Sequence, residues 1–116
     1  MVDERIIRFF RRHHVLTIAT CAGNEPWCAN CFYVYLPERN ALVFTTDDKT
    51  RHGQEFRLNS LVAGSVVLET KVIGRIRGIQ FQALVSEPEG DAMDEARKAY
   101  LKRFPVAMLM ETHLWS

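Results

Sequence analysis

The sequence predicts one small domain, mainly β and of the α+β class, in which an antiparallel barrel is flanked by short helices. Five segments have the composition of β-strands, and most of them are separated only by short turns. Helical patterns lie at both ends of the chain and once between the third and fourth strands. Because strands and helices do not alternate as they do in parallel βαβ folds, a small barrel is favoured.

Length and composition fit a single soluble domain. The chain has 116 residues, of which 47% are hydrophobic and 25% are charged, and its formal net charge is +1. This near-neutral balance gives no indication of nucleic-acid binding. The N-terminus lacks the continuous apolar run of a signal peptide, and no segment approaches the roughly 20 apolar residues of a membrane-spanning helix. With three cysteines, an odd number that fits a reducing compartment, the protein is predicted to be cytoplasmic.

The first half of the chain predicts a helix, a hairpin, a third strand and a second helix. Asp3 is the predicted cap of the first helix, which runs to about His14 with apolar residues on one side. The turn residues AGNEP separate two strands that form a predicted hairpin. The predicted ranges are 15–20, 27–35 and 41–46 for the strands and 50–58 for the second helix.

The second half predicts two strands and a closing helix. The strands cover residues 61–69 and 72–86, and Gly74 and Gly78 mark a bulge or a close approach in the second one. The predicted cap of the last helix is Asp91, with Asp94 completing a pattern similar to a capping box, and Pro105 ends the helix.

Cysteine and histidine residues do not indicate a metal or redox site. The motif CANC places Cys28 and Cys31 three residues apart, but in a strand such residues point to opposite faces. No second pair of cysteines or histidines completes a zinc site in the sequence. Cys21 is interpreted in the same way, as a small buried or edge residue. The adjacent histidines of RRHH diverge by about 100° on a helix, so no metal ligand is assigned.

The stretch FTTDDKTRH has the features of an anion site. A strand ends in two threonines, a third threonine begins a helix, and an arginine and a histidine follow in its first turn. Free N–H groups and the helix dipole favour a phosphate there, and arginine can add a bidentate contact. Alternatively, Thr50 only caps the helix and Arg51 pairs with Asp47 or Asp48; the spacing supports both interpretations equally. The candidate residues are Thr45, Thr46, Thr50, Arg51 and His52.

The segment RIRGIQFQA adds cations to the long predicted strand. Arg75 and Arg77 would lie on one face with Ile79. The opposite face would carry Ile76, Gly78 and Gln80. An outward ladder of ion pairs is one interpretation. If Gly78 lets a flat ligand approach the backbone, the same strand borders the anion site.

Several motifs resemble one protein family across almost the whole chain. They are HVLTIAT, WCANCFYVY, LVFTTDDKTRHGQEF, LVAGSV, IRGIQFQA and ARKAYLKRFPVA, in that order. On these motifs the chain resembles the pyridoxamine 5'-phosphate oxidase-like FMN-binding split-barrel proteins, and more narrowly their uncharacterised bacterial YhbP-like branch. The resemblance implies a split β-barrel homodimer that holds FMN at the subunit interface.

The resemblance also assigns roles to residues. Arg51 would hold the phosphate together with the threonines around it, and His52 stands where the oxidases usually have lysine. Gly78 falls near a position that often carries a flavin-contacting glutamine, and Gln80 lies two residues further on. The strand WCANCF would border the flavin ring, and its candidates are Cys28, Ala29, Asn30 and Cys31.

Two departures from the family pattern bear on activity. The arginine-rich signature of the true oxidases is absent from the strand WCANCF. Related proteins continue into another strand after the position of Trp115, whereas this sequence stops at Ser116. The chain is therefore expected to be one split-barrel domain, residues 1–116, without the family's final strand. Pyridoxamine phosphate oxidase activity is not predicted.

The leading prediction is an FMN-binding flavoprotein, a candidate oxidoreductase of unknown substrate, in which the protein positions the flavin and the cofactor transfers electrons or hydride. No catalytic acid or base is assigned. One alternative is a flavin-independent dimeric module that binds haem or another ligand without catalysis. Another is a structural remnant that needs a partner to complete its sheet. The expected partners are a second copy of the chain and a small molecule, with no nucleic acid and no membrane.

Overall fold

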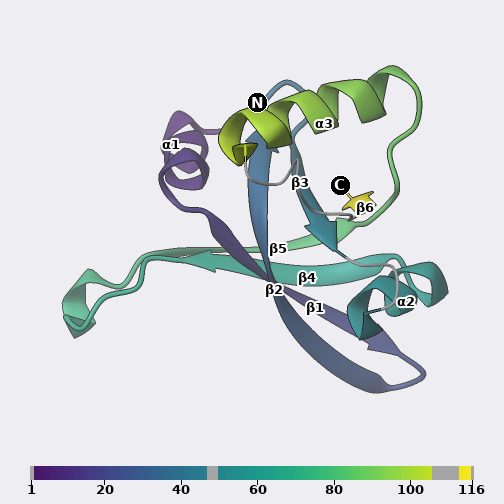
Figure 1. The fold of residues 1–116 in the computed structure, drawn as a ribbon. Helices are drawn as coiled ribbons and strands as arrows, with labels where there is room; N and C mark the ends of the chain where they lie inside the picture. Colours follow the sequence, from purple (N-terminus) through teal and green to yellow (C-terminus); the bar gives the residue numbers. More distant parts are fainter. Residues whose placement is uncertain (1, 47–49, 106–112, 116) are drawn as a thin grey trace.

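Six strands form one antiparallel sheet in the computed structural model of the protein, which describes residues 2–46, 50–105 and 113–115. The spatial order of the strands is β5-β4-β1-β2-β3-β6, so the first hairpin lies at the centre of the sheet. The long strands cross and curl into half of a barrel (Figure 1), which confirms the predicted split-barrel fold. The strands are β1 (Val15–Ala22), β2 (Glu25–Leu36), β3 (Ala41–Thr46), β4 (Leu61–Val67), β5 (Gly78–Leu84) and β6 (His113–Trp115).

Three α-helices of the described chain pack against this sheet, α1 (Glu4–Arg12), α2 (Arg51–Leu58) and α3 (Asp91–Arg103). In Figure 1, α1 and α3 lie at one end of the sheet, and α2 lies beside β1 and β4. The predicted cap of α1 is confirmed, because the carboxylate of Asp3 accepts a hydrogen bond from the N–H of Arg5 at 2.8 Å. Within the described ranges, none of the helices has the length and apolar character needed to cross a membrane.

The hairpin of β1 and β2 is confirmed together with its turn. Gly23 and Asn24 have positive φ angles, 57° and 71°, as a two-residue turn between right-handed twisted strands requires. The register pairs Ala22 with Glu25 next to the turn. Because side chains alternate along both strands, this register fixes which of them face α2.

Two apolar clusters of described residues hold the elements together. The larger one fills the inner side of the curl, where α1 contributes Phe10 and α2 contributes Phe56. The smaller one lies between α3 and the other side of β2 and β3, and it includes Val43 and Tyr100. Strands β2 and β3 are therefore covered on both faces in this part of the molecule, which fixes their position.

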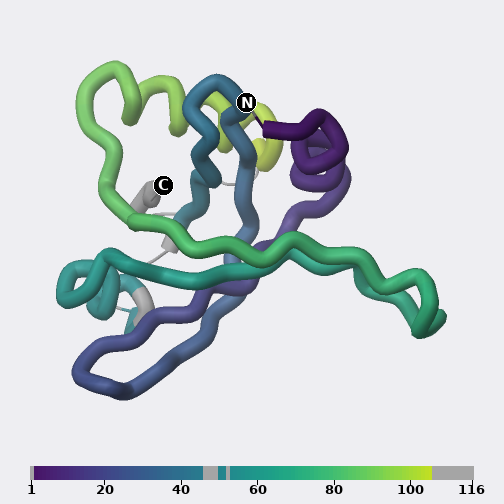
Figure 2. Tube along the Cα trace, turned by 180° about the vertical axis from the view of Figure 1, so that it is seen from behind, coloured from purple at the N-terminus to yellow at the C-terminus, as the bar shows by residue number. Residues whose placement is uncertain are grey.

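The predicted strand 72–86 is wrong in its first half. Residues Ile73–Arg75 form a 3-10 turn, and β5 begins only at Gly78. The β4–β5 hairpin projects from the body of the molecule, as Figure 2 shows from behind, and Ile73 near its tip is 92% exposed. Its β-branched residues have the composition of a strand, but a hairpin tip offers them no sheet surface on which to pack.

Two further predictions fail for local reasons. Arg75 and Arg77 both precede β5, so they do not form a ladder with Ile79 on one strand face. The cap of α3 is Gly90 and not Asp91, which is the first residue of the helix. The φ of Gly90 is 59°, a left-handed conformation that glycine adopts at little cost.

Candidate functional site

The start of α2 has the predicted cap at Thr50, a feature shared by the two interpretations of this stretch, an anion site and a purely structural helix start. Thr50 is the cap, and its hydroxyl oxygen accepts a hydrogen bond from the N–H of Gly53 at 3.2 Å. Arg51 and His52 are the first two residues of the helix, and Thr46 is the last residue of β3. The predicted ion pair of Arg51 with Asp47 or Asp48 lies outside the described residues.

Arg51 is held from three sides. Its Nε donates to Oε1 of Glu55 at 3.0 Å, and one of its terminal nitrogens donates to Oε2 of Glu25 at 3.4 Å. The guanidinium carbon lies 4.2 Å from the centre of the Trp27 ring, close enough for a cation–π contact. The side chain is still 44% exposed, so a ligand can reach it.

The Glu55 carboxylate forms the buried floor of this site. Glu55 is only 7% exposed, and the hydroxyl of Thr20, which is 2% exposed, donates to its second oxygen. A buried carboxylate needs a cation and hydrogen bonds to offset its desolvation, and Arg51 and Thr20 supply both. The position of the guanidinium is therefore set by the core of the protein.

The four predicted flavin-ring residues of β2 lie on two opposite faces. Ala29 packs against the larger apolar cluster, of which Cys31 is a buried member, on the same side as Trp27 and α2. Cys28 and Asn30 are exposed on the other side. The predicted separation of the two thiols is confirmed. Burial raises the pKa of the Cys31 thiol to about 11, so this group is protonated at neutral pH.

Gly78 and Gln80 lie on the outer face of the sheet, far along it from α2. The cross-strand register continues from Gln80 to Ser65, then to Thr17 and to Asn30. The hydroxyl of Thr17 donates to the amide oxygen of Asn30 at 2.8 Å. The result is a row of polar side chains across β5, β4, β1 and β2. Gly78 belongs to the same face, because it lies two residues before Gln80 on β5.

Exposed apolar side chains surround this polar row. Five of them have exposed fractions between 45% and 71%, and they share the outer face of β1, β2, β4 and β5 by alternation. An exposed apolar area of this kind, with polar groups within it, is typical of an interaction surface. The residues are Val15, Phe32, Leu61, Val67 and Leu84.

Thr45 lies apart from both groups, on the side of β3 that faces α3. Its hydroxyl lies 3.0 Å from the hydroxyl of Tyr100 on α3. Tyr100 is 5% exposed, and this burial raises its pKa although the bond to Thr45 opposes the shift. Within one chain, the predicted residues whose side chains the structure describes therefore fall into an inner group with Arg51, an outer group with Gln80, and Thr45 beneath α3.

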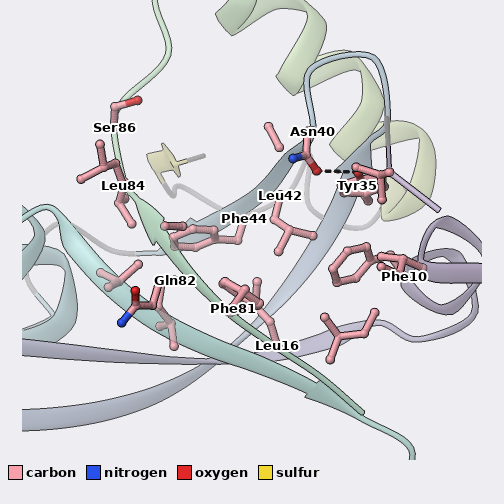
Figure 3. A pocket seen from close by; sticks show the side chains of 18 residues that line it. Phe10, Leu16, Tyr35, Asn40, Leu42, Phe44, Phe81, Gln82, Leu84 and Ser86 are labelled. Atoms are coloured by element: carbon pink, nitrogen blue, oxygen red, sulfur yellow. Dashed lines mark hydrogen bonds between the residues drawn. The ribbon is translucent and has the colours of Figure 1, made fainter. Parts of the chain in front are cut away.

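A separate apolar cavity of about 590 Å³ lies between β5, β3 and α1 (Figure 3). Aromatic and aliphatic side chains such as Phe10, Phe44 and Phe81 form most of its walls. The amide oxygen of Asn40 at its edge accepts a hydrogen bond from the Tyr35 hydroxyl at 2.7 Å. Its size is that of a small-molecule pocket, but none of the predicted site residues is among its described walls.

The sequence did not identify the residues that hold Arg51. Glu55 follows Arg51 by four positions on the same helix, a spacing at which opposite charges commonly pair, so this ion pair could have been predicted from the sequence. Glu25 and Trp27 come from a strand far away in the sequence, and only the fold brings them to α2. Among the described residues, no group of three or more His, Cys, Asp or Glu side chains could hold a metal ion.

Solved structures with this fold include proteins named for different ligands. A heme binding protein from Mycobacterium smegmatis has a TM-score of 0.79 and 22% identity, and the match covers 93% of this chain and 47% of that one. HutZ, a heme storage protein from Vibrio cholerae, has a TM-score of 0.79 and 18% identity, covering 97% and 86%. The FAD binding protein from M. smegmatis has a TM-score of 0.77 and 14% identity, covering 99% and 86%. At these identities the likeness shows the fold.

Sequence comparison identifies the family more closely. No family model matches the chain. It is 42% identical over 110 residues to a UPF0306 protein of Photorhabdus laumondii, a match that covers 95% of this chain and 77% of the relative. It is 44% identical over 110 residues to the UPF0306 protein YhbP of Salmonella arizonae, covering 95% and 75%. The chain therefore belongs to the UPF0306 family.

Proposed function

We propose that the protein is an FMN-binding flavoprotein that holds the flavin at the interface of a homodimer. The observation that carries this proposal is the half-exposed Arg51, held at the first turn of α2 by Glu55 and Trp27. A cation fixed in this way beside the N–H groups of a helix start is suited to a phosphate group. Bound FMN would supply electron or hydride transfer, while the chain binds and orients it.

The division of the predicted residues between two faces supports an interface site. The inner group contains Arg51 and Ala29, whereas the outer group contains Asn30 and Gln80. One chain cannot bring both groups around a single flavin, but two copies can each contribute one. The exposed apolar residues around the polar row give the outer face the character of a surface that a second copy covers.

Light scattering tests the dimer. We expect a mass twice that of the chain at micromolar concentrations. Replacing Phe32, which is 57% exposed, by glutamate should produce a monomer, since a buried charge would face the apolar surface of the partner. A wild-type monomer would remove the interface and contradict the proposal.

Titration with FMN tests the cofactor. We expect quenching of flavin fluorescence, and Arg51→Ala should weaken binding by about 1.5 to 3 kcal/mol, the value of a hydrogen bond to a charged group, which is roughly 10- to 150-fold in affinity. Arg57→Ala is the matched control, because Arg57 is on the same helix and pairs with Glu87 at 2.7 Å. Absence of quenching, or equal effects of the two variants, would count against the site.

Haem is the second candidate ligand. The heme binding protein of M. smegmatis and the heme storage protein HutZ share the fold, and the described chain has an apolar cavity of about 590 Å³. An absorbance spectrum of the purified protein separates the two candidates. Absorbance bands at about 370 and 450 nm indicate flavin, whereas a strong Soret band indicates haem.

A further inference from the structure

We infer that Glu25 occupies the phosphate-binding edge of Arg51 in the free protein and is displaced when a phosphate binds, whereas Glu55 keeps its bond to the same guanidinium. This inference rests on the proposed function and adds to it. It makes Glu25 a residue that determines which ligands are bound, and Glu55 a positioning residue.

The two carboxylates differ in burial. The side chain of Glu25 is 78% exposed and that of Glu55 is 9% exposed. The bond from Arg51 to Glu25 measures 3.4 Å, close to the limit for a hydrogen bond, and the bond to Glu55 measures 3.0 Å. An exposed ion pair of this length contributes little to stability, so Glu25 can leave at small cost.

The two carboxylates also differ in their other partners. The second oxygen of Glu55 accepts the hydroxyl of the buried Thr20, which fixes the carboxylate from below. Within the described part of the chain, the carboxylate of Glu25 has no polar partner besides Arg51. Glu25 is also the first residue of β2, directly after the turn at Gly23 and Asn24. Its side chain can therefore swing into solvent without disturbing the core.

A phosphate on Arg51 would compete with Glu25, because two anions bound to neighbouring N–H groups of one guanidinium repel each other. The Nε of Arg51 donates to Glu55, and Trp27 covers one face of the guanidinium. A phosphate that binds two N–H groups in a bidentate manner needs the terminal nitrogens, and Glu25 already engages one of them. A doubly charged phosphate competes well with a single exposed carboxylate, whereas a ligand without a phosphate has nothing to exchange for it.

The test compares Glu25→Gln with Glu38→Gln. Both substitutions remove one negative charge from an exposed glutamate, but Glu38 lies after the opposite end of β2. Each variant is titrated with FMN and with riboflavin, which lacks the phosphate. We expect Glu25→Gln to bind FMN up to about fivefold more tightly than wild type, the scale of an exposed ion pair. Riboflavin affinity should be unchanged, and Glu38→Gln should match wild type with both ligands.

Inorganic phosphate separates this inference from the proposed function. The Nε–H signal of Arg51 in NMR spectra should shift on addition of phosphate, at lower concentrations in Glu25→Gln than in Glu38→Gln. If this holds but FMN does not bind, the exchange at Arg51 is supported for another phosphorylated ligand and the flavin proposal fails. If the two variants respond equally to FMN and to phosphate, the inference is overturned whether or not flavin binds. An equal gain for riboflavin in Glu25→Gln would also overturn it.

Discussion

Among the described residues, two arginines lie over aromatic rings, and their partners differ. Arg51 lies 4.2 Å from the ring centre of Trp27 and bonds to two carboxylates. Arg103, the last residue of α3, lies 5.1 Å from the ring centre of Tyr33. Its nitrogens donate to main-chain carbonyl oxygens at the end of α1, those of Phe10, Arg11 and His13.

The acceptors decide what each arginine can do. The last carbonyl groups of a helix have no partner within the helix, so Arg103 supplies hydrogen bonds that the helix itself cannot make, and its charge suits the negative end of the helix dipole. These carbonyls belong to the backbone and cannot move aside for a ligand. One acceptor of Arg51, the carboxylate of Glu25, is an exposed side chain that can move aside. Arg103 is therefore a structural link between α1 and α3, and Arg51 is available for binding.

The largest effect on stability is expected for Arg103→Ala. It removes three hydrogen bonds and takes this partner from the carbonyl groups of Arg11 and His13, whereas the Phe10 carbonyl keeps the Tyr33 hydroxyl; the loss should lower the free energy of unfolding by about 3 kcal/mol. Urea denaturation measures this change. Arg97→Ala, at an exposed position of the same helix, should change it by less than about 0.5 kcal/mol. FMN affinity should be unaffected by Arg103→Ala, and a loss as large as that of Arg51→Ala would erase the distinction between the two arginines.

A smaller effect is expected for Tyr33→Phe. The Tyr33 hydroxyl donates to the carbonyl oxygen of Phe10 at 2.8 Å, and the side chain has no exposed surface. Loss of this bond should lower the free energy of unfolding by about 1 to 1.5 kcal/mol, less than Arg103→Ala, because the Phe10 carbonyl keeps Arg103 as a partner. Thermal or urea unfolding gives the value. If Tyr33→Phe costs as much as Arg103→Ala, the hydroxyl of Tyr33 stabilises the end of α1 as strongly as the guanidinium of Arg103 does.

The sequence predicts most of the fold because local signals and the global arrangement agree. The turn at Gly23 and Asn24, the cap at Asp3 and the alternation in β1 and β2 are all visible in short stretches. The failure at residues 72–77 has a physical cause. Val72, Ile73 and Ile76 suit a strand, but nothing local shows that they lie at the exposed tip of a hairpin.

The site is predicted less completely than the fold. Thr50 and Arg51 were identified because a capping residue and a cation at a helix start form a local pattern. Glu25 and Trp27 reach Arg51 only through the register of the β1–β2 hairpin. Arg103 carries no signal, because main-chain carbonyls accept hydrogen bonds whatever the sequence of α1.

A further prediction concerns the cap that places Arg51. Thr50→Ala removes the acceptor for the N–H of Gly53, and the loss of a cap costs about 1 kcal/mol. We expect unfolding in urea to shift by this amount and FMN affinity to fall as well, because the first turn of α2 frays. Thr50→Ser keeps the hydroxyl and should restore both. A change in stability without a change in FMN affinity would show that the binding of flavin does not need an ordered first turn.

The smallest effect on stability is expected from the two thiols of CANC. Like the two arginines, one of them is accessible and the other is enclosed by the protein. Cys28 is exposed, whereas Cys31 is 7% exposed and burial raises its pKa from 9.0 to about 11. At pH 8 a thiol reagent should modify Cys21 and Cys28 quickly and Cys31 only after unfolding, because the thiolate is the reactive form.

The raised pKa of Cys31 also determines how the stability of the protein depends on pH. The folded protein holds the Cys31 proton more tightly than the unfolded chain, so this contribution to stability is complete below pH 9 and is lost as the pH rises through about 11. Cys31→Ala should reduce the fall in the free energy of unfolding between pH 9 and about 11, as measured by urea denaturation at a series of pH values. Below pH 9 the variant and wild type should depend on pH in the same way. Rapid modification of Cys31 in the folded protein would show that solvent reaches the inner face of β2, and would contradict the distinction between a buried and an accessible thiol.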